Sequence, residues 1–215
     1  MYPSVRAAFR AFNEPFEGVV PWMYLDVKGL VTVGVGNLVD PLELAVQLPF
    51  RLRANPALAA SPDQIAEEWR RIKNSPALAK AGYRASELLT QLMLDDAGID
   101  ALIAQRLSAN EPVLKRFPAF REFDSWPADA QLGLLSMAWA LGPRGPAAFP
   151  HFAAACGTQD FAGAAANCTI SESGNPGVAP RNRANLTLFR NAAVVVSGGS
   201  SYDPAALHFP VALGG

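Results

Sequence analysis

The sequence predicts an α+β fold, with a small β-hairpin lobe near the N-terminus and a larger helical lobe. Three observations lead to this prediction. Apolar residues alternate on both sides of a short turn within residues 22–36, which is typical of a β-hairpin. Start and stop signals of helices then follow one another along most of the 215-residue chain. Half of the residues are hydrophobic, so the chain can bury a sizeable core.

The N-terminal segment predicts a helix that leads into the hairpin. Apolar side chains recur there at helical spacing, at Val5, Phe9, Phe12 and Phe16. We expect the helix to cover about residues 4–13 and to end at Pro15. The stretch WMYLD then alternates, VKG turns and LVTVGVG alternates again, so that two strands are expected to pair.

Beyond the hairpin the sequence predicts a series of helices. Ser61 and Pro62 are typical of a helix start, and this helix is expected to run through SPDQIAEEWRRIK. A long helix is expected to begin at Ser86 and to cover SELLTQLMLDDAGIDALIAQRL. Another is expected over PADAQLGLLSMAWALG, with a stop signal at Gly142. Three shorter helices are expected over residues 147–156, 159–167 and about 179–191.

Two segments carry no clear helix or strand pattern. Residues 39–60 receive no assignment. Residues 193–215 are rich in Gly, Ser and Pro, and form either an extension over the surface or a linker. We therefore expect one domain over residues 1–192 followed by this tail. Its β-lobe should cover about residues 17–60, and its helical lobe about 61–192 together with the N-terminal helix.

Composition and charge exclude several classes of function. The formal net charge of −1 argues against a broad nucleic-acid-binding surface. No apolar run approaches the ~20 residues of a membrane span. Arg6, Arg10 and Glu14 interrupt the apolar positions of the N-terminus, so we expect no signal peptide in this chain. His151 and His208 have no metal-ligand spacing with the two Cys residues, so we expect neither a metal site nor a cofactor.

Two further sets of side chains each have two interpretations. Cys156 and Cys168 lie at the ends of adjacent predicted helices, and they form either a disulfide or two separate thiols. Arg181, Arg183 and Arg190 form either a basic strip for an anionic glycan or the solvated face of a helix.

The second strand of the hairpin has one apolar side and one nearly bare side. Thr32, Gly34 and Gly36 alternate with valines and therefore share one side. Glycine in a strand often marks the close approach of a ligand or another backbone, so we expect this side to line a cleft. The strand itself is expected to tolerate valine at Gly34 or Gly36, because valine favours strands.

Two acids stand just upstream of this strand. Glu17 follows the predicted N-terminal helix, and Asp26 precedes the turn. Two carboxyl groups and the Thr32 hydroxyl at an open groove suit glycoside hydrolysis, in which one acid protonates the leaving oxygen and the other holds a water. Each residue also has an ordinary explanation: a solvated charge for Glu17, turn formation for Asp26 and strand propensity for Thr32.

The joint spacing of these residues resembles the catalytic pattern of the T-even phage lysozyme family of muramidases. Eight residues separate Glu17 from Asp26, five separate Asp26 from Thr32, and VGVGNL follows. Farther along, LLSMAWALGPRGPAAF resembles the family's central core helix, and NPGVAPRNRANLTLF resembles its arginine-rich C-terminal helix. The resemblance covers about residues 5–191 and implies a lysozyme-like fold, with the active-site cleft between the two lobes.

The resemblance also implies a reaction. Glu17 would be the general acid, and Asp26 and Thr32 would position the attacking water. The substrate would be peptidoglycan, cleaved with inversion at the β-1,4 bond between N-acetylmuramic acid and N-acetylglucosamine.

Other matching positions are implied to support the acid or to bind substrate. Arg181 falls where the family pairs an arginine with the catalytic glutamate. The implied substrate contacts are Gly36, Leu38 and Trp139. Of the four tryptophans, Trp139 is expected to be the one best placed for exposure in the cleft.

Three features depart from the family pattern. Asn37 stands where the family usually has a histidine paired with an aspartate, which would be Asp96 here. Ala140 stands where an amide is common. Residues 39–60 are longer than in the compact phage enzymes, a feature shared with lysozyme-like domains of bacterial toxins and secretion effectors.

Three functions are therefore considered. The leading one is a muramidase in bacterial cell-wall lysis, either an endolysin or an antibacterial toxin effector. The alternatives are a lytic transglycosylase, which needs a glutamate but no water-holding partner, and a non-catalytic peptidoglycan-binding domain. We expect a monomer that acts on glycan strands in the periplasm or cell wall. It would be delivered by a holin, by a secretion system or as part of a larger protein, with a delivery apparatus or an immunity protein as a further partner.

Overall fold

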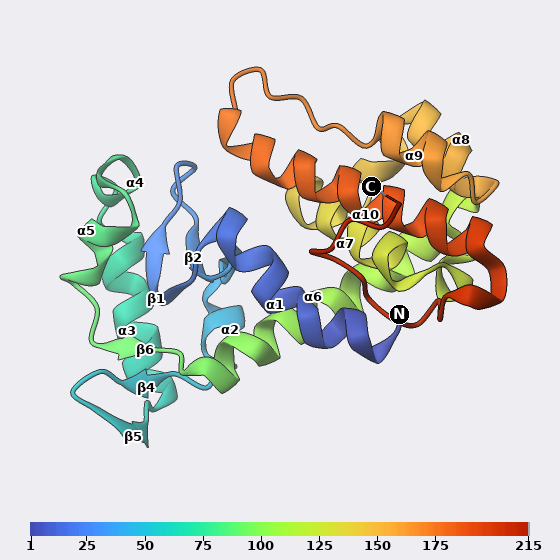
Figure 1. Ribbon diagram of the computed structural model, residues 1–215. Helices are drawn as coiled ribbons and strands as arrows, with labels where there is room; N and C mark the ends of the chain where they lie inside the picture. Colours follow the sequence, from blue (N-terminus) through green and yellow to red (C-terminus); the bar gives the residue numbers. More distant parts are fainter. Residues whose placement is uncertain (215) are drawn as a thin grey trace. The chain divides into compact units, whose positions relative to one another are not determined.

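The computed structural model describes residues 1–214 and has the expected α+β class. About 58% of the chain is helical, and the strands form small antiparallel sheets (Figure 1). The chain divides into two compact units. The hairpin unit comprises residues 17–104, and the helical unit comprises residues 1–16 and the chain from Gln105 onward. The hairpin unit is larger than the β-lobe expected at 17–60, because it also holds the helices between residues 61 and 104.

Two small antiparallel sheets lie in the hairpin unit. The first has the strand order β1-β2-β3, with β1 at Val20–Leu25, β2 at Val31–Gly34 and β3 at Asn37–Leu38. The second has the order β5-β4-β6, with β4 at Arg51–Leu52, β5 at Asn55–Ala59 and β6 at Leu92–Met93. The predicted hairpin is therefore confirmed as β1 and β2. The unassigned segment 39–60 supplies β4, β5 and a short helix.

Four helices complete the hairpin unit, and a fifth begins there. They are α2 (Leu42–Ala45), α3 (Pro62–Lys73), α4 (Leu78–Ala81), α5 (Tyr83–Glu87) and α6 (Asp96–Lys115). The start of α3 is as predicted. Ser61 Oγ accepts a hydrogen bond from the Gln64 N–H at 3.2 Å, and Gln64 Oε1 accepts one from the Ser61 N–H at 2.8 Å. This reciprocal capping satisfies two backbone donors at the helix start.

The prediction of a long helix from Ser86 is wrong, because α6 begins ten residues later, at Asp96. Leu92 and Met93 are instead paired with β4. The buried Glu68 accepts the N–H groups of Gln91 and Leu92 at Oε2, at 2.5 and 3.1 Å. Sheet pairing and these two hydrogen bonds supply hydrogen-bond partners for the backbone of residues 91–93 without a helix. Tertiary contacts therefore override the local helix preference.

The helical unit contains the remaining helices, some of them single 3₁₀ turns. The α-helices are α1 (Pro3–Glu17), α7 (Ala128–Leu141), α8 (Pro150–Gly157), α9 (Phe161–Asn167) and α10 (Ala179–Gly198). The 3₁₀ turns are Pro118–Phe120, Phe123–Ser125, Gly145–Ala148, Pro176–Val178 and Gly199–Ser201.

Helix α1 continues past the proline that was expected to end it. Pro15 lies inside the helix, which runs to Glu17. The ring of Phe16 packs edge-on against Phe12, at 5.3 Å between centroids, and the Arg181 guanidinium lies 4.8 Å from the Phe16 ring centre. These contacts stabilise the last turn, while a proline there costs the helix a hydrogen bond.

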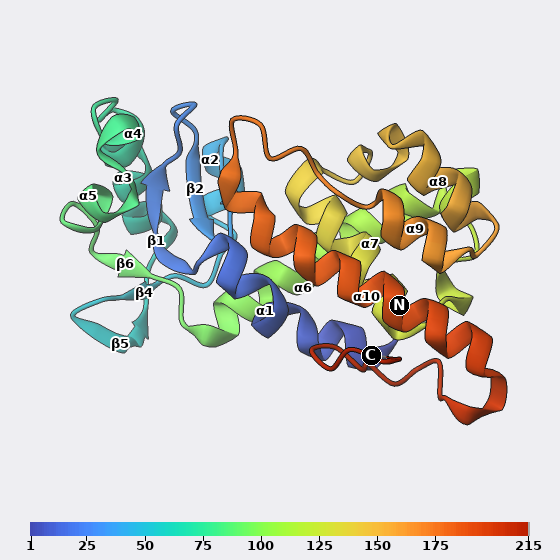
Figure 2. The ribbon, with the colours of Figure 1, turned by 45° about the horizontal axis from the view of Figure 1, so that its top comes forward.

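Helix α7 is the buried centre of the helical unit. It ends at Gly142, as predicted, which has a φ of +80°. Helix α10 packs along it, as both views show (Figures 1 and 2). The two helices meet closely at Gly133, where an added Cβ would lie 2.8 Å from Cζ of Phe189. The Phe189 ring also packs on Phe152, with 5.2 Å between centroids.

We expect Gly133→Ala to destabilise the helical unit, although alanine is the better helix former. The new methyl group would overlap the fixed Phe189 ring, and overpacking of a core costs about 1–3 kcal/mol. Chemical denaturation of the variant and the parent protein measures the free energy of unfolding. Gly177→Ala, whose added Cβ meets no atom closer than 3.6 Å, is the matched control. A Gly133→Ala protein at least as stable as the parent would contradict this packing.

The C-terminal tail is attached to the helical unit. Helix α10 extends to Gly198, beyond the expected end near residue 191. The buried Asp129 carboxylate accepts hydrogen bonds from the N–H groups of His208 and Phe209 at 2.9 and 3.0 Å. Asn191 of α10 donates to the Val211 carbonyl at 2.8 Å. The described part of the tail therefore packs against the helical unit, as in the interpretation of an extension over the surface.

Cys156 and Cys168 are two free, buried thiols, so the disulfide interpretation is not supported. Burial raises the pKa of both, that of Cys168 to about 11. Within residues 1–214, no helix is long and apolar enough to cross a membrane. No group of three or more His, Cys, Asp or Glu side chains in that range could hold a metal ion.

Candidate active site

The first sheet of the hairpin unit aligns three side chains in one row. Its register places Tyr24 opposite Thr32, and Thr32 opposite Leu38. Directly opposite residues of antiparallel strands point to the same face, so these side chains lie side by side. Val31 and Val33 point to the other face and are fully buried. Along the row, Thr32 is 5% exposed and Leu38 is 50% exposed.

Asp26 follows β1 and fixes the turn of the hairpin. Its Oδ1 accepts hydrogen bonds from the N–H groups of Lys28 and Leu30, at 2.8 and 2.9 Å. The Asp26 N–H donates to the Leu30 carbonyl at 2.9 Å. The ordinary explanation of Asp26 as a turn residue is therefore correct for Oδ1. Within residues 1–214, Oδ2 accepts no hydrogen bond, so it stays available to a water or a ligand.

Glu17 is the last residue of α1 and is exposed. Its carboxylate lies beside the turn that joins β2 to β3, because a Cβ placed on Gly36 would be 3.8 Å from Glu17 Oε2. Gly36 is exposed, and its φ of +79° is a conformation that glycine adopts easily. The predicted acid and the predicted glycine contact therefore adjoin each other.

The bare side of β2 is only partly open, which corrects the expectation from the sequence. Gly34 is buried, and an added Cβ would lie 3.3 Å from Asn37 Oδ1, 3.4 Å from Leu102 Cδ1 and 3.6 Å from Ile99 Cδ1. Helix α6 thus covers this position. Gly34 also has a φ of +69°, so valine at Gly34 or Gly36 would be strained. The expectation that the strand would tolerate valine there is wrong.

Tyr24 is the residue that the motif did not include. The pKa of Tyr24 is raised. Burial is the largest cause, and the negative charges of Asp26 and Glu17 add to it. Both predicted catalytic carboxylates therefore raise the pKa of the same phenol, that of Tyr24. The signal was present in the sequence, because Tyr24 precedes Asp26 by two residues on an alternating strand and so faces the same side.

Asn37 is buried at the start of β3. Its Oδ1 accepts no hydrogen bond from any residue between 1 and 214 and touches the Gly34 position. Its supporting role stays a prediction, and so does its pairing with Asp96.

Arg181 is 2% exposed and lies in the first turn of α10. Its Nη1 donates to Asn13 Oδ1 at 3.0 Å, and to the carbonyl and hydroxyl oxygens of Ser136 at 3.2 Å each. Its guanidinium also lies over the ring of Phe16, the residue directly before Glu17. The guanidinium is therefore held rigidly within the helical unit. Its pairing with Glu17 stays a prediction.

Trp139 is only 3% exposed, so the expectation of an exposed ring is wrong. The Phe9 ring lies 4.9 Å away, and the Arg106 guanidinium lies 4.0 Å from the indole centre. Arg106 Nη2 also donates to the Trp139 carbonyl at 2.9 Å. An aromatic contact and a cation both pack on the indole, which gives Trp139 a packing role. The neighbouring Ala140 is exposed.

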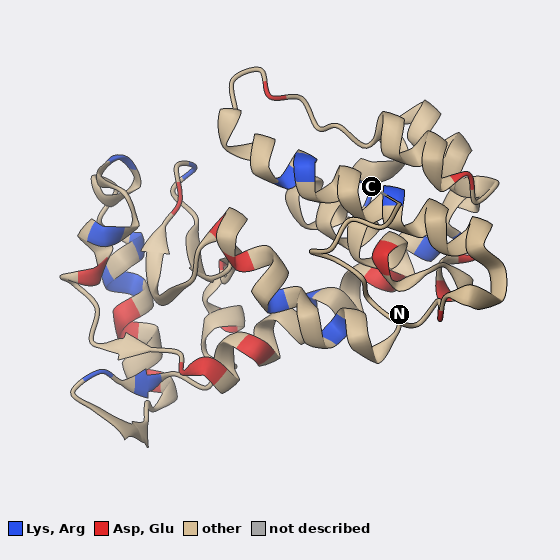
Figure 3. Ribbon diagram, in the orientation of Figure 1, with Lys and Arg blue, Asp and Glu red and all other residues tan. Residues whose placement is uncertain are grey.

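The basic residues of α10 do not form one exposed strip. Figure 3 marks the Lys and Arg positions along the ribbon in blue. Arg183 and Arg190 are exposed, whereas Arg181 is buried. The solvated-face interpretation is therefore correct for Arg183 and Arg190, and Arg181 has a separate structural role.

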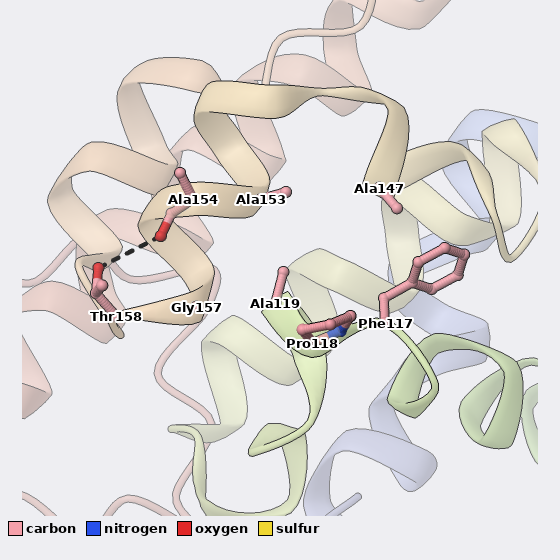
Figure 4. A pocket seen from close by; sticks show the side chains of 8 residues that line it. All are labelled: Phe117, Pro118, Ala119, Ala147, Ala153, Ala154, Gly157 and Thr158. Carbon is pink, nitrogen blue, oxygen red and sulfur yellow. Dashed lines mark hydrogen bonds between the residues drawn. The ribbon is translucent and has the colours of Figure 1, made fainter.

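A hollow of about 540 Å³ lies in the helical unit (Figure 4). Its lining residues are mostly small or apolar: Phe117, Pro118, Ala119, Ala147, Ala153, Ala154, Gly157 and Thr158. The Thr158 hydroxyl donates to the Ala154 carbonyl at 3.4 Å. The lining has no charged side chain, so it offers no acid or base, and none of the predicted site residues belongs to it.

The sequence matches no family model, and no curated protein is significantly similar to it.

Proposed function

We propose that this protein is a muramidase that hydrolyses the β-1,4 bond between N-acetylmuramic acid and N-acetylglucosamine in peptidoglycan. The observation that carries the proposal is the arrangement of Glu17, Asp26 and Thr32 around one small sheet of the hairpin unit. Glu17 adjoins the turn at Gly36, Thr32 lies in the middle of the sheet, and Asp26 lies at its turn.

Glu17 serves as the general acid in this proposal. Its exposed carboxyl group donates a proton to the glycosidic oxygen as the bond breaks. The resemblance implies a lysozyme-like fold in which Arg181 supports this carboxyl group, and both belong to the proposal.

Asp26 and Thr32 hold the attacking water. The two turn amides fix Oδ1 of Asp26, so the carboxylate presents Oδ2 in a defined direction. The Thr32 hydroxyl donates to the Leu30 carbonyl at 3.3 Å, which leaves its lone pairs to accept a hydrogen bond from water. A separate base that activates water opposite the acid is the arrangement of an inverting glycosidase.

The chemical ends released from purified peptidoglycan test this proposal. We expect reducing N-acetylmuramic acid ends and no 1,6-anhydro sugars, because water is the nucleophile. Mass spectrometry before and after borohydride reduction distinguishes the two products. Dominant anhydro ends would make the protein a lytic transglycosylase, and binding without cleavage would make it a glycan-binding domain.

A further inference from the structure

The sheet face that carries Thr32 also carries Tyr24, which the muramidase motif does not contain. Tyr24, Thr32 and Leu38 are directly opposite one another across β1, β2 and β3. The row thus presents an aromatic ring, a hydroxyl group and an aliphatic side chain in succession. Sugar rings have apolar C–H faces and polar rims, and amphipathic side chains such as tyrosine match both.

The ring of Tyr24 packs on a neighbouring ring, but its hydroxyl group has no protein partner among residues 1–214. Tyr83 of α5 packs edge-on against the ring, with 6.3 Å between centroids. Tyr24 is half-buried, and its hydroxyl group forms no hydrogen bond with the described chain. A tyrosine hydroxyl in a partly buried setting ordinarily finds a partner, so the missing partner is a water or a ligand.

The surroundings of this hydroxyl group favour its protonated form. Burial and the charges of Asp26 and Glu17 all raise the pKa of Tyr24 above its ordinary value of 10.0. The phenol is therefore neutral at neutral pH and available as a hydrogen-bond donor.

We infer that the Tyr24 hydroxyl donates a hydrogen bond to the bound glycan beside the bond that is cleaved, while Leu38 contacts the same sugar at the other end of the row. This inference rests on the proposed function, because the ligand is the glycan of that reaction. It assigns Tyr24 to substrate binding: the hydroxyl group orients the sugar over Thr32, and it exchanges no proton.

Tyr24→Phe removes only the hydroxyl oxygen and keeps the ring that packs on Tyr83. Loss of one neutral hydrogen bond should raise KM about 5–10-fold and leave kcat within about twofold. The same variant should weaken binding of a soluble tetrasaccharide of alternating N-acetylglucosamine and N-acetylmuramic acid by about the same factor. Calorimetry in a Glu17→Gln background measures that binding without turnover.

Tyr83→Phe is the matched control, because it removes the same atom from the ring that packs on Tyr24. Its KM and tetrasaccharide affinity should equal those of the parent protein. The thermal midpoints of Tyr24→Phe and Tyr83→Phe should both stay close to the parent's thermal midpoint.

An active parent with unchanged KM and affinity in Tyr24→Phe would overturn the inference and leave the muramidase proposal standing. A fall in kcat alone would also overturn it, since the hydroxyl group would then act in the chemical step. A parent that releases no sugar ends would overturn the proposed function. The tetrasaccharide titration, repeated without the Glu17→Gln change, would then decide the Tyr24 contact.

Discussion

Glu17→Gln should abolish release of sugar ends from peptidoglycan while the protein stays folded. The amide is nearly isosteric with the carboxyl group but has no acidic proton for the leaving oxygen. Loss of a general acid lowers the rate by about 10²–10⁴-fold. Glu17 is exposed at the end of α1, so the substitution should change the thermal midpoint little. The initial rate of end release, measured against the parent, gives the effect.

Glu14→Gln provides the control for this substitution. Glu14 is an exposed acid in the same helix, three residues earlier, so its variant makes the same change of charge. We expect its rate to equal that of the parent protein. Equal rates for Glu17→Gln and the parent would remove Glu17 from the reaction. Equal losses in both variants would indicate an effect of net charge on the binding of the polymer.

Asp26→Asn should also lower the rate by about 10²-fold or more, but through the water rather than the leaving group. The asparagine side-chain oxygen can still accept hydrogen bonds from the Lys28 and Leu30 amides, so the turn should persist. At the other position, an amide N–H₂ replaces the carboxylate oxygen and cannot take a proton from water. The expected result is a nearly inactive protein with a free energy of unfolding within about 1 kcal/mol of the parent value.

Asp26→Ala separates the catalytic role of Asp26 from its turn role. Alanine loses both turn hydrogen bonds, so this variant should be inactive and also less stable than Asp26→Asn, by about 1–3 kcal/mol. Denaturant titrations of both variants and the parent measure that difference. Full activity in Asp26→Asn, together with lost stability in Asp26→Ala, would make Asp26 a turn residue only.

Glu17→Gln and Asp26→Asn together distinguish the reaction classes. A hydrolase that uses a positioned water needs both carboxyl groups, so both variants should be inactive. A lytic transglycosylase uses an internal sugar hydroxyl as the nucleophile and needs only the glutamate. In that case Glu17→Gln would be inactive, and Asp26→Asn would release anhydro ends at the parent rate.

Local signals in the sequence predicted the elements whose hydrogen bonds are local. The capped start of α3 at Ser61 and the end of α7 at Gly142 are of this kind, because each depends on groups within a few residues. The β1–β2 hairpin is similar, since alternation and a tight turn specify it. The spacing of Glu17, Asp26 and Thr32 could likewise be recognised from the sequence, because the three residues lie within sixteen consecutive positions.

Contacts between distant residues decided the rest. Residues 92 and 93 are extended because β4 pairs with them and Glu68 binds their region, partners that lie more than twenty positions earlier. Gly34 is covered by Ile99 and Leu102 of α6, which alternation along a strand cannot reveal. Trp139 is buried because Phe9 and Arg106 lie against it.

The sequence by itself determined the α+β class, the hairpin and the acid–acid–hydroxyl spacing, because backbone geometry and side-chain alternation act over short distances. Only the tertiary structure decided which side chains are open to a ligand. Burial depends on which remote segments pack together, and it placed Trp139 and Gly34 inside, left Gly36 and Leu38 exposed, and set Tyr24 beside Thr32. A strand's sequence shows which residues share a face, but the pairing register and the packed neighbours decide what that face meets.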